Sequence, residues 1–333
     1  MEKNLKHIAI IGGGIMGISS ALYLIRRGCK VTIIEKEPNG EPASYGNASW
    51  LSSSSITPVL MPGAIFKIPK MLFSRDGPLF LNFPGVLRIL PWLLKYLSYS
   101  SEVKVNYISD HLAPLLSNSF EEHKKLAEGT DALKWIVNSP FLFIYKNRED
   151  YIRETLTWNI RKKHGFKPIE IGKDELSALV PELSEEYTFA IKINNQGYIS
   201  NSKKYLNDLI EGFKKLGGKI IEDEVVDISS DQKTIIIKGK KEEMFSDSVV
   251  IAAGVFSDKL SKKFGANVPL QSERGYHLEL RETNIKLNYP LMNSSLKLAI
   301  TPRPNGIRFA GLVEFGSLYS EPNKNAFDLL MIS

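Results

Sequence analysis

Apolar and polar positions near the N-terminus predict a strand, a helix and a second strand in that order. Residues 8–11 are continuously apolar, residues 15–27 have helical spacing, and residues 31–34 are rich in β-branched side chains. Gly28 stands where the helix would end, a position that suits glycine. The first part of the chain is therefore expected to be a β-α-β unit.

Further along, the same kind of pattern predicts two interleaved domains. A helix that Asn201 or Ser202 can cap runs to residue 216 and stops at Gly217 and Gly218. Strands are expected over 219–228, 234–238 and 248–252, and amphipathic helices around 108–128 and 150–164. We predict one domain over 1–75 and 198–266, and a second domain over 76–197 and 267–333.

The segment 79–99 is rich in Leu, Phe and Trp, and two interpretations of it remain open. Pro84, Arg88, Pro91 and Lys95 interrupt the segment, so it is not long and uncharged enough to cross a bilayer. A pair of core helices is the first interpretation. The alternative is a membrane-surface patch with basic residues at its rim, on the inner face of a membrane.

Composition and charge narrow the class of protein. The chain has 333 residues, of which 43% are hydrophobic, enough for a sizeable core. Its 43 basic and 37 acidic residues are spread along the chain, and no basic block with interleaved aromatics predicts nucleic-acid binding. One cysteine and five histidines without ligand spacing predict no metal site. No signal-peptide cleavage site follows the first apolar run, so we expect a cytoplasmic protein.

Three glycines lie where the predicted first strand becomes a helix. Gly12, Gly14 and Gly17 form G-x-G-x-x-G, which allows a tight turn, admits a pyrophosphate and lets the helix pack closely on the sheet. Glu35 ends the next strand, where a carboxylate accepts hydrogen bonds from ribose hydroxyls and disfavours the 2′-phosphate of NADP. The pattern predicts a dinucleotide site.

The segment that follows favours FAD over NAD. Residues 38–63 are irregular and rich in Gly, Ser, Asn and Pro, whereas an NAD dehydrogenase normally continues with further β-α units. A loop of this length inside a compact domain is usually functional. A simple NAD-binding dehydrogenase stays open as an alternative.

Together these motifs resemble the FAD-dependent D-amino-acid dehydrogenase family, within the wider group that includes glycine oxidase, sarcosine oxidase and D-amino-acid oxidase. The fold class that the resemblance implies is α/β and α+β, with a Rossmann-like FAD-binding domain and an interleaved antiparallel-sheet substrate domain. Besides the glycine turn and Glu35, five segments carry the resemblance: ASYGNAS (43–49), PVLMPG (58–63), VVIAAGVFS (249–257), ERGYHLEL (273–280) and AITPRPNGIRFAGLVEFG (299–316).

The resemblance also implies which residues bind the cofactor. Glu35 and the three glycines would hold the ADP half of FAD, Val226 would present its backbone to the adenine, and Gly254 would let the chain pass close to the cofactor. A plain strand-end turn is the alternative role of Gly254. The full set of expected cofactor-binding residues is Gly12, Gly14, Gly17, Glu35, Lys36, Ser44, Gly46, Asn47, Ala48, Val226 and Gly254.

The expected chemistry is that of the flavin. In this group the Cα hydrogen of a small amino acid leaves as hydride, and the imino acid then hydrolyses to a 2-oxo acid and ammonia. The electrons pass to a quinone, another carrier or oxygen. Tyr276 and His277 are the expected substrate contacts, and Arg274 and Arg308 could each bind a carboxylate through two parallel hydrogen bonds. A core tyrosine, a satisfied histidine and structural ion pairs are the alternatives.

The end of the chain departs from the family pattern. Members of the group continue through a G-x-R-P segment, whose arginine grips the substrate carboxylate, and no such segment is visible before Ser333. The sequence therefore predicts that the family's C-terminal segment is absent, as in a truncated product or fragment. A non-catalytic remnant of the dinucleotide-binding fold is the alternative to an active enzyme.

Overall fold

A computed structural model describes residues 5–44, 46–63, 79–81, 83–231, 233–315, 321–323, 326, 328, 330 and 331. Contacts between backbone positions divide the chain into two compact units. Unit 1 comprises Met1–Tyr45, Lys124–Trp135 and Ser202–Gln271, and unit 2 comprises Gly46–His123, Ile136–Asn201 and Ser272–Ser333.

These units differ in detail from the predicted domain division. The expected boundary near residue 75 lies outside the described residues, and residues 46–63 group with unit 2. Residues 124–135 group with unit 1, because the 3-10 helix η1 (Asp131–Trp135) packs on helix α9 (Ser202–Lys215). Trp135 Nε1 donates a 2.7 Å hydrogen bond to Asp208 of that helix.

The core of unit 1 is a four-stranded parallel sheet in the order β10-β2-β1-β14. The predicted β-α-β unit is present, with its helix ending one residue earlier than expected. The first elements are β1 (His7–Ile11), α1 (Ile15–Arg26) and β2 (Lys30–Glu35). The later ones are β10 (Lys219–Glu222), β14 (Ser248–Ile251), η2 (Gly254–Phe256), α10 (Ser257–Ser261) and η3 (Lys262–Phe264).

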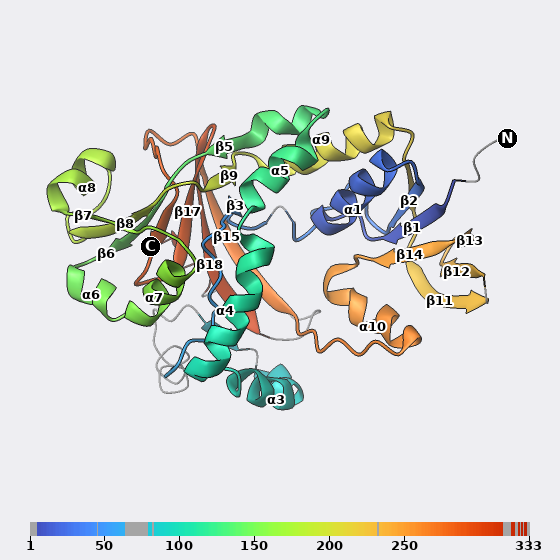
Figure 1. Cartoon of the computed structure of the whole chain (residues 1–333), viewed down its shortest axis with the longest axis horizontal. Helices are drawn as coiled ribbons and strands as arrows, with labels where there is room; N and C mark the ends of the chain where they lie inside the picture. The colour runs from blue at the N-terminus through green and yellow to red at the C-terminus, as the bar shows by residue number, and fades with distance from the viewer. Residues whose placement is uncertain are drawn as a thin grey trace. The chain divides into compact units, whose positions relative to one another are not determined.

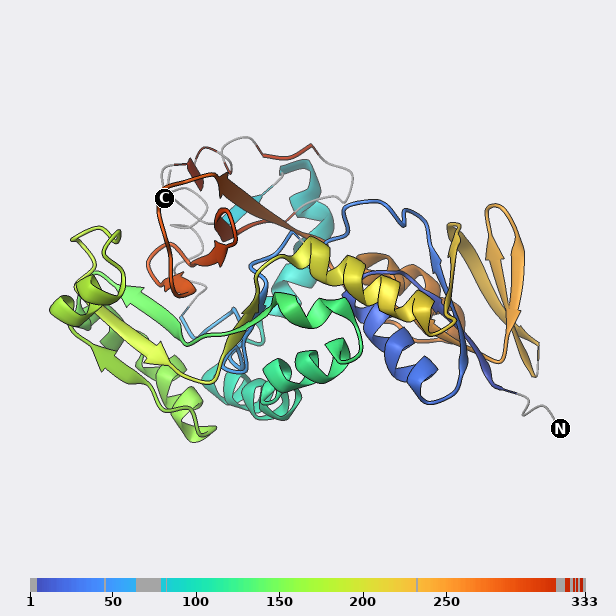
Figure 2. The same ribbon diagram turned by 90° about the horizontal axis from the view of Figure 1, so that it is seen from above.

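Both faces of this sheet are covered, which explains why its strands are apolar throughout. Helices α1 and α9 lie side by side on one face, as Figures 1 and 2 show. On the other face, Ala9, Ile11 and Ile34 pack against Ile228, Ile237 of the neighbouring small sheet and Leu260 of α10. A parallel sheet buried on both sides reads in sequence as unbroken apolar runs.

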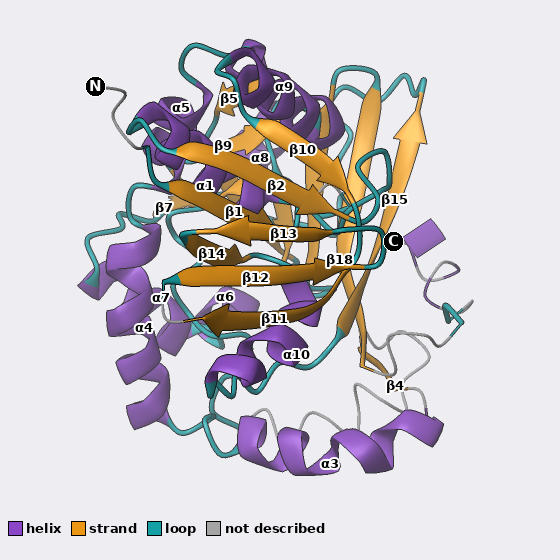
Figure 3. Ribbon diagram, turned by 90° about the vertical axis from the view of Figure 1, so that its right-hand side faces the viewer, coloured by secondary structure: helices purple, strands orange, loops and turns teal. Residues whose placement is uncertain are grey.

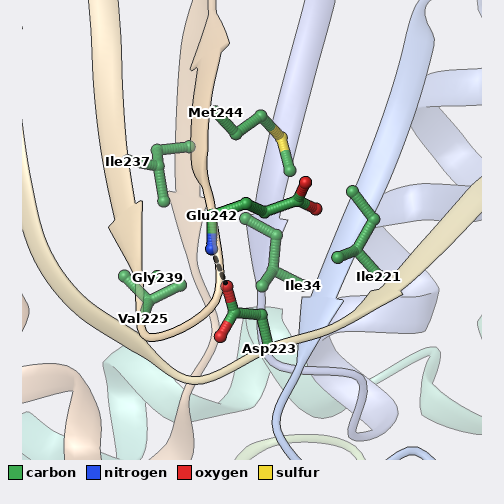
Figure 4. A pocket seen from close by; sticks show the side chains of 8 residues that line it. All are labelled: Ile34, Ile221, Asp223, Val225, Ile237, Gly239, Glu242 and Met244. Atoms are coloured by element: carbon green, nitrogen blue, oxygen red, sulfur yellow. Dashed lines mark hydrogen bonds between the residues drawn. The ribbon is translucent and has the colours of Figure 1, made fainter.

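The strand expected over 219–228 is wrong as a single element. The chain forms β10 and then, after Asp223 and Glu224, β11, which belongs to a separate antiparallel sheet. Asp223 turns the chain there, since its buried carboxylate accepts hydrogen bonds from the backbone N–H groups of residues 224, 240, 241 and 242. Figure 4 shows the bond from Glu242. The sheet consists of β11 (Val225–Asp231), β12 (Thr234–Gly239) and β13 (Glu243–Ser246).

Unit 2 is built on an eight-stranded mixed sheet. Most pairs are antiparallel, as expected, but β16 with β6 and β18 with β4 are parallel. Its two longest strands, β15 and β18, pair with each other (Figure 3). The strands are β4 (Leu79–Leu81), β6 (Phe141–Tyr145), β7 (Ile169–Ile171), β8 (Phe189–Ile193), β15 (Glu273–Arg281), β16 (Leu291–Asn293), β17 (Leu298–Arg303) and β18 (Gly306–Phe315).

A small second sheet in unit 2 joins β3 (Trp50–Leu51), β9 (Gly197–Ile199) and β5 (Ile136–Asn138). Each predicted amphipathic stretch holds two helices. The helices are α3 (Phe83–Leu97), α4 (Glu102–Leu116), α5 (Ser119–Ala127, which continues into unit 1), α6 (Arg148–Ile152), α7 (Thr155–Lys163) and α8 (Lys173–Leu179).

The pair of core helices expected over 79–99 is wrong, because one helix, α3, runs through Pro91. Proline near the middle of a helix removes one backbone hydrogen bond but does not always end the helix. Leu90 and Leu94 of α3 are exposed, so the helix is only partly a core element. Among the described residues, no helix is long and apolar enough to span a membrane.

Candidate cofactor and active site

The glycine turn of unit 1 has no room for side chains at two of its three motif positions. Gly12 has a φ of +105°, and a Cβ there would lie 2.4 Å from the carbonyl oxygen of Ala252. A Cβ on Gly17 would lie 1.8 Å from the carbonyl oxygen of Gly12. Helix α1 therefore begins directly against the end of β1, which brings its N-terminal N–H groups to the carboxyl edge of the sheet.

Two polar side chains lie over this turn. Glu35 Oε2 accepts a 2.6 Å hydrogen bond from the N–H of Gly13, and Glu35 Oε1 accepts one of 3.0 Å from the N–H of Glu37. Ser44 Oγ accepts a 2.9 Å hydrogen bond from the N–H of Ile15 at the start of α1. Glu35 and Ser44 thus flank the glycines, and their roles toward a nucleotide stay predictions.

Val226 and Gly254, also in unit 1, both lie where the backbone is irregular. The ladder between β11 and β12 shifts register between Val225 and Asp227, so Val226 is the extra residue of a β-bulge. A bulge residue has no partner in the ladder, which leaves its backbone groups for other contacts. Gly254 has a φ of +57°, and a Cβ there would meet nothing within 4 Å.

In unit 2, hydrogen bonds hold the segment 46–50 against the large sheet. Arg308 Nη1 donates to the carbonyl oxygen of Asn47 at 3.1 Å, and Thr301 Oγ1 donates to that of Ala48 at 2.7 Å. Trp50 Nε1 donates to the same Thr301 hydroxyl at 2.8 Å. The segment expected to approach the flavin is thereby held on β17 and β18.

The four residues expected to be catalytic divide between the two faces of this sheet. A Cβ on Gly46 would lie 3.3 Å from His277 Cε1, so His277 lies against the segment 46–50 together with Arg308. Tyr276 instead is buried in the core cluster with Leu298 and Leu312. Side chains of neighbouring strand residues point to opposite faces, which explains the separation.

Tyr276 and Arg274 share a partner on their own face. Tyr276 Oη donates a 2.5 Å hydrogen bond to Glu314 Oε2 and accepts one of 2.7 Å from the N–H of Asn323. Arg274 Nη1 lies 3.3 Å from the same Glu314 oxygen. Burial is the main cause that raises the pKa of Tyr276 above its usual value, and the bond to Glu314 adds to it. Their roles toward substrate stay predictions.

A buried ionic cluster on the other face contains two residues that the sequence did not single out, Arg303 and Glu279. Arg308 Nε and Nη2 both donate to Glu279 Oε1, at 3.1 and 2.7 Å. Arg303 Nη1 donates to the carbonyl oxygens of Ile199 and Ser200, and its Nη2 donates to Ser49 Oγ, each at 2.9 Å. Ser49 has a φ of +62°, so Arg303 holds a residue in an unfavourable backbone conformation.

The charges of this cluster influence one another. Burial, and after it the charge of the neighbouring Arg308, lower the pKa of Arg303 to about 10. Burial alone would raise the pKa of Glu279, but Arg308 and the other arginines around it bring it below its usual value. Two guanidinium groups and one carboxylate give the segment 46–50 a net positive neighbourhood. The sequence offers one weak hint of this cluster, since Glu279 and Arg308 are charged residues that stand directly between apolar neighbours.

Comparison with known proteins identifies the family. The model of the FAD-dependent oxidoreductase family called DAO matches residues 7–331, so the chain belongs to this family. It is 32% identical over 329 residues to a D-amino-acid oxidase of Bradyrhizobium diazoefficiens, covering 98% of this chain and 78% of that protein. It is 23% identical over 322 residues to a D-amino acid dehydrogenase of Helicobacter pylori, covering 94% of this chain and 75% of that one.

Solved structures agree on the fold. Glycine oxidase from Geobacillus kaustophilus superposes with a TM-score of 0.67 at 18% identity, covering 98% of this chain and 77% of that one. L-proline dehydrogenase from P. horikoshii gives a TM-score of 0.66 at 17% identity, covering 98% and 75%. The predicted fold class, a Rossmann-like FAD-binding domain joined to a substrate domain, is confirmed.

Family membership confirms the FAD cofactor, and the residues of unit 1 fit it. Gly12 and Gly17 let α1 begin tightly against the end of β1, and a Cβ on Gly14 would meet only Ser44 Oγ, at 3.1 Å. Glu35 stands at the end of β2, where a ribose carboxylate partner belongs. Val226 adds a bulged backbone. A nucleotide diphosphate can therefore rest on bare backbone at the start of α1.

Proposed function

We propose that this chain oxidises the C–N bond of a small amino acid, in the first instance a D-amino acid. The product is an imino acid that hydrolyses to a 2-oxo acid and ammonia. Two relatives named D-amino-acid oxidase and D-amino acid dehydrogenase support this substrate class. The observation that carries the proposal is the attachment of segment 46–50 to the sheet face where His277 and Arg308 lie.

FAD, when bound, supplies the acceptor for the hydride that leaves Cα. The protein binds and orients the substrate and excludes water, and no residue has to act as a nucleophile. His277 lies against Gly46, where an imidazole can hydrogen-bond a substrate carboxylate or tune the cofactor. Arg308 is a positioning residue, because its donors are used by Glu279 and Asn47.

The substrate carboxylate would meet a positive neighbourhood. The buried cluster of Arg303, Arg308 and Glu279 carries one more positive than negative charge. A carboxylate brought close to it gains favourable Coulomb energy that water screens poorly in a buried site. Tyr276 and Arg274 are retained as predicted substrate contacts, although Glu314 already occupies both.

Two electron acceptors are proposed, oxygen and a quinone, since relatives carry the names of both an oxidase and a dehydrogenase. We propose a cytoplasmic location for the protein. The alternative, which suits a quinone acceptor, is that the protein binds to the inner surface of the membrane. Exposed apolar residues on α3 and α4, among them Leu94 and Tyr107, support the surface contact.

The test is anaerobic mixing of the purified, FAD-loaded protein with a panel of D-amino acids, glycine and D-proline. Bleaching of the flavin absorbance by a D-amino acid and not by its L-enantiomer is the expected result. Oxygen consumption compared with reduction of a soluble quinone analogue then separates the two acceptors. A yellow protein that no member of the panel bleaches contradicts the proposed substrate class.

A further inference from the structure

An exposed aromatic ring lies at the edge of the unit 1 sheet where nucleotides bind. Strand β1 pairs in parallel with β2 and β14, with Ile11 opposite both Ile34 and Ile251. The chain therefore leaves all three strands at the same edge, and this carboxyl edge is the binding edge of open parallel sheets. Phe256 follows β14 by only a few residues.

Local backbone fixes the place of Phe256. It ends the short helix η2, and its N–H donates a 3.1 Å hydrogen bond to the carbonyl oxygen of Ala253. Phe256 is 42% exposed, so a large part of this apolar residue is left uncovered by the protein.

Other parts of the nucleotide edge converge on this ring. Lys36, the residue after Glu35, places Nζ 4.7 Å from the centroid of the Phe256 ring. The Lys36 charge also helps to lower the pKa of Glu224, after the larger effect of Lys240, so Lys36 lies near the start of β11. The bulge at Val226 is two residues beyond Glu224.

We propose that Phe256 stacks on the adenine of FAD, beside the bulged backbone of Val226 that the family resemblance places at the same base. Adenine offers a flat π face and a polar edge, and an aromatic ring beside a backbone with free polar groups matches both. Lys36 is a long and half-exposed side chain, so it can move aside when the base arrives. The proposal depends on FAD and not on the identity of the amino-acid substrate.

The first test measures the dissociation constants of ADP and FAD for the apoprotein by isothermal titration calorimetry. Phe256→Ala is expected to weaken ADP about tenfold, which corresponds to about 1.4 kcal/mol and lies within the range for base-aromatic stacking. Phe256→Tyr is expected to bind within about twofold of the wild type, because it keeps the ring.

The matched control is Phe245→Ala. Phe245 is 55% exposed on β13. Asp247, two residues further along the chain, hydrogen-bonds to His7 at the start of β1. Phe245 therefore lies near the amino edge of the parallel sheet, opposite the carboxyl edge where nucleotides bind. The Phe245→Ala variant should leave ADP binding unchanged. Equal loss of ADP binding in Phe245→Ala, or none in Phe256→Ala, overturns the proposal.

A spectroscopic readout protects the test against misfolding of the alanine variant. In Phe256→Trp, ADP should quench the added tryptophan emission, whereas in Phe245→Trp it should not. A quench that is the same in both variants rejects the stacking contact. If the wild-type apoprotein binds neither ADP nor FAD, the cofactor site itself fails, whereas a failed substrate panel leaves this result intact.

Discussion

The imidazole of His277 lies directly against Gly46. A Cβ added at Gly46 would be only 3.3 Å from Cε1 of His277. The two residues are 231 positions apart in the sequence. Their contact joins the segment expected to approach the flavin with the strand expected to contact the substrate. The geometry of this pair is therefore the most direct link between the predicted cofactor and substrate residues of unit 2.

Replacement of Gly46 by Ala should disturb this contact. The added methyl must displace the ring by a few tenths of an ångström, and overpacking of this kind costs about 1 kcal/mol of unfolding free energy. The cost should shrink when His277 is also Ala, which a double-mutant cycle in urea measures. Gly275→Ala is the control, because a Cβ there meets nothing within 4 Å. Additive effects of the two substitutions contradict the contact.

Gly12→Ala should abolish retention of FAD and lower stability more than Gly28→Ala. Both glycines have positive φ, which costs a non-glycine residue about 1–2 kcal/mol. Only at Gly12 would the new Cβ also collide with Ala252, because Gly28 has nothing within 4 Å. Urea unfolding and the flavin absorbance of the purified proteins measure the difference. Equal stability of the two variants would show that the turn is not tight.

Arg303→Met should lower the unfolding free energy by about 2 kcal/mol, because two partly buried carbonyl groups and Ser49 Oγ lose their donor. Arg281→Met is the matched control, since Arg281 also pairs with Glu279 but is largely exposed, and an exposed pair contributes about 0–1 kcal/mol. Chemical denaturation of both variants provides the comparison. A loss at Arg281 as large as at Arg303 is the contradictory result.

Asp223 should make unit 1 sensitive to acid. Burial raises its pKa, but four backbone N–H donors outweigh burial and lower the folded pKa below the ordinary value. A depressed carboxyl pKa contributes stability above the unfolded value of about 4, and this stability is lost as pH falls through the folded value.

Asp223→Asn should therefore be less stable than the wild type at pH 7, and the difference should narrow towards pH 4 and below. Thermal unfolding followed by circular dichroism across this pH range measures it. Asp231→Asn, at an exposed position, should show no such trend. A difference that does not change with pH would contradict the role of the Asp223 charge.

Contact with a membrane surface is testable on α4. Val103, Tyr107 and Leu115 are exposed at spacings of four and eight residues, which place them on one helix face. Val103→Glu with Tyr107→Glu should weaken binding to anionic lipid vesicles, measured by co-sedimentation, at least about a hundredfold, because insertion of each apolar side chain is worth about 1.5–3 kcal/mol. Leu216→Glu is the control. No binding of the wild-type protein to such vesicles disproves the contact.

The sequence by itself determined the β-α-β unit, the glycine turn and the FAD-binding class. These features depend on local rules: periodicity sets strand and helix, and only glycine tolerates the φ of Gly12 and the approach of α1 at Gly17. The family resemblance extended this to the fold class, a Rossmann-like FAD-binding domain joined to a substrate domain, which the solved structures confirm.

Only the tertiary structure decided which predicted residues share a site. Tyr276 and His277 are neighbours in sequence, yet one enters the core and the other lies against Gly46. Arg303 meets Ser49 across 254 positions, and Asp223 ends a strand that the apolar pattern would have continued. Sequence periodicity reports which residues are buried, whereas partners brought together by pairing of distant strands follow from packing of the whole chain.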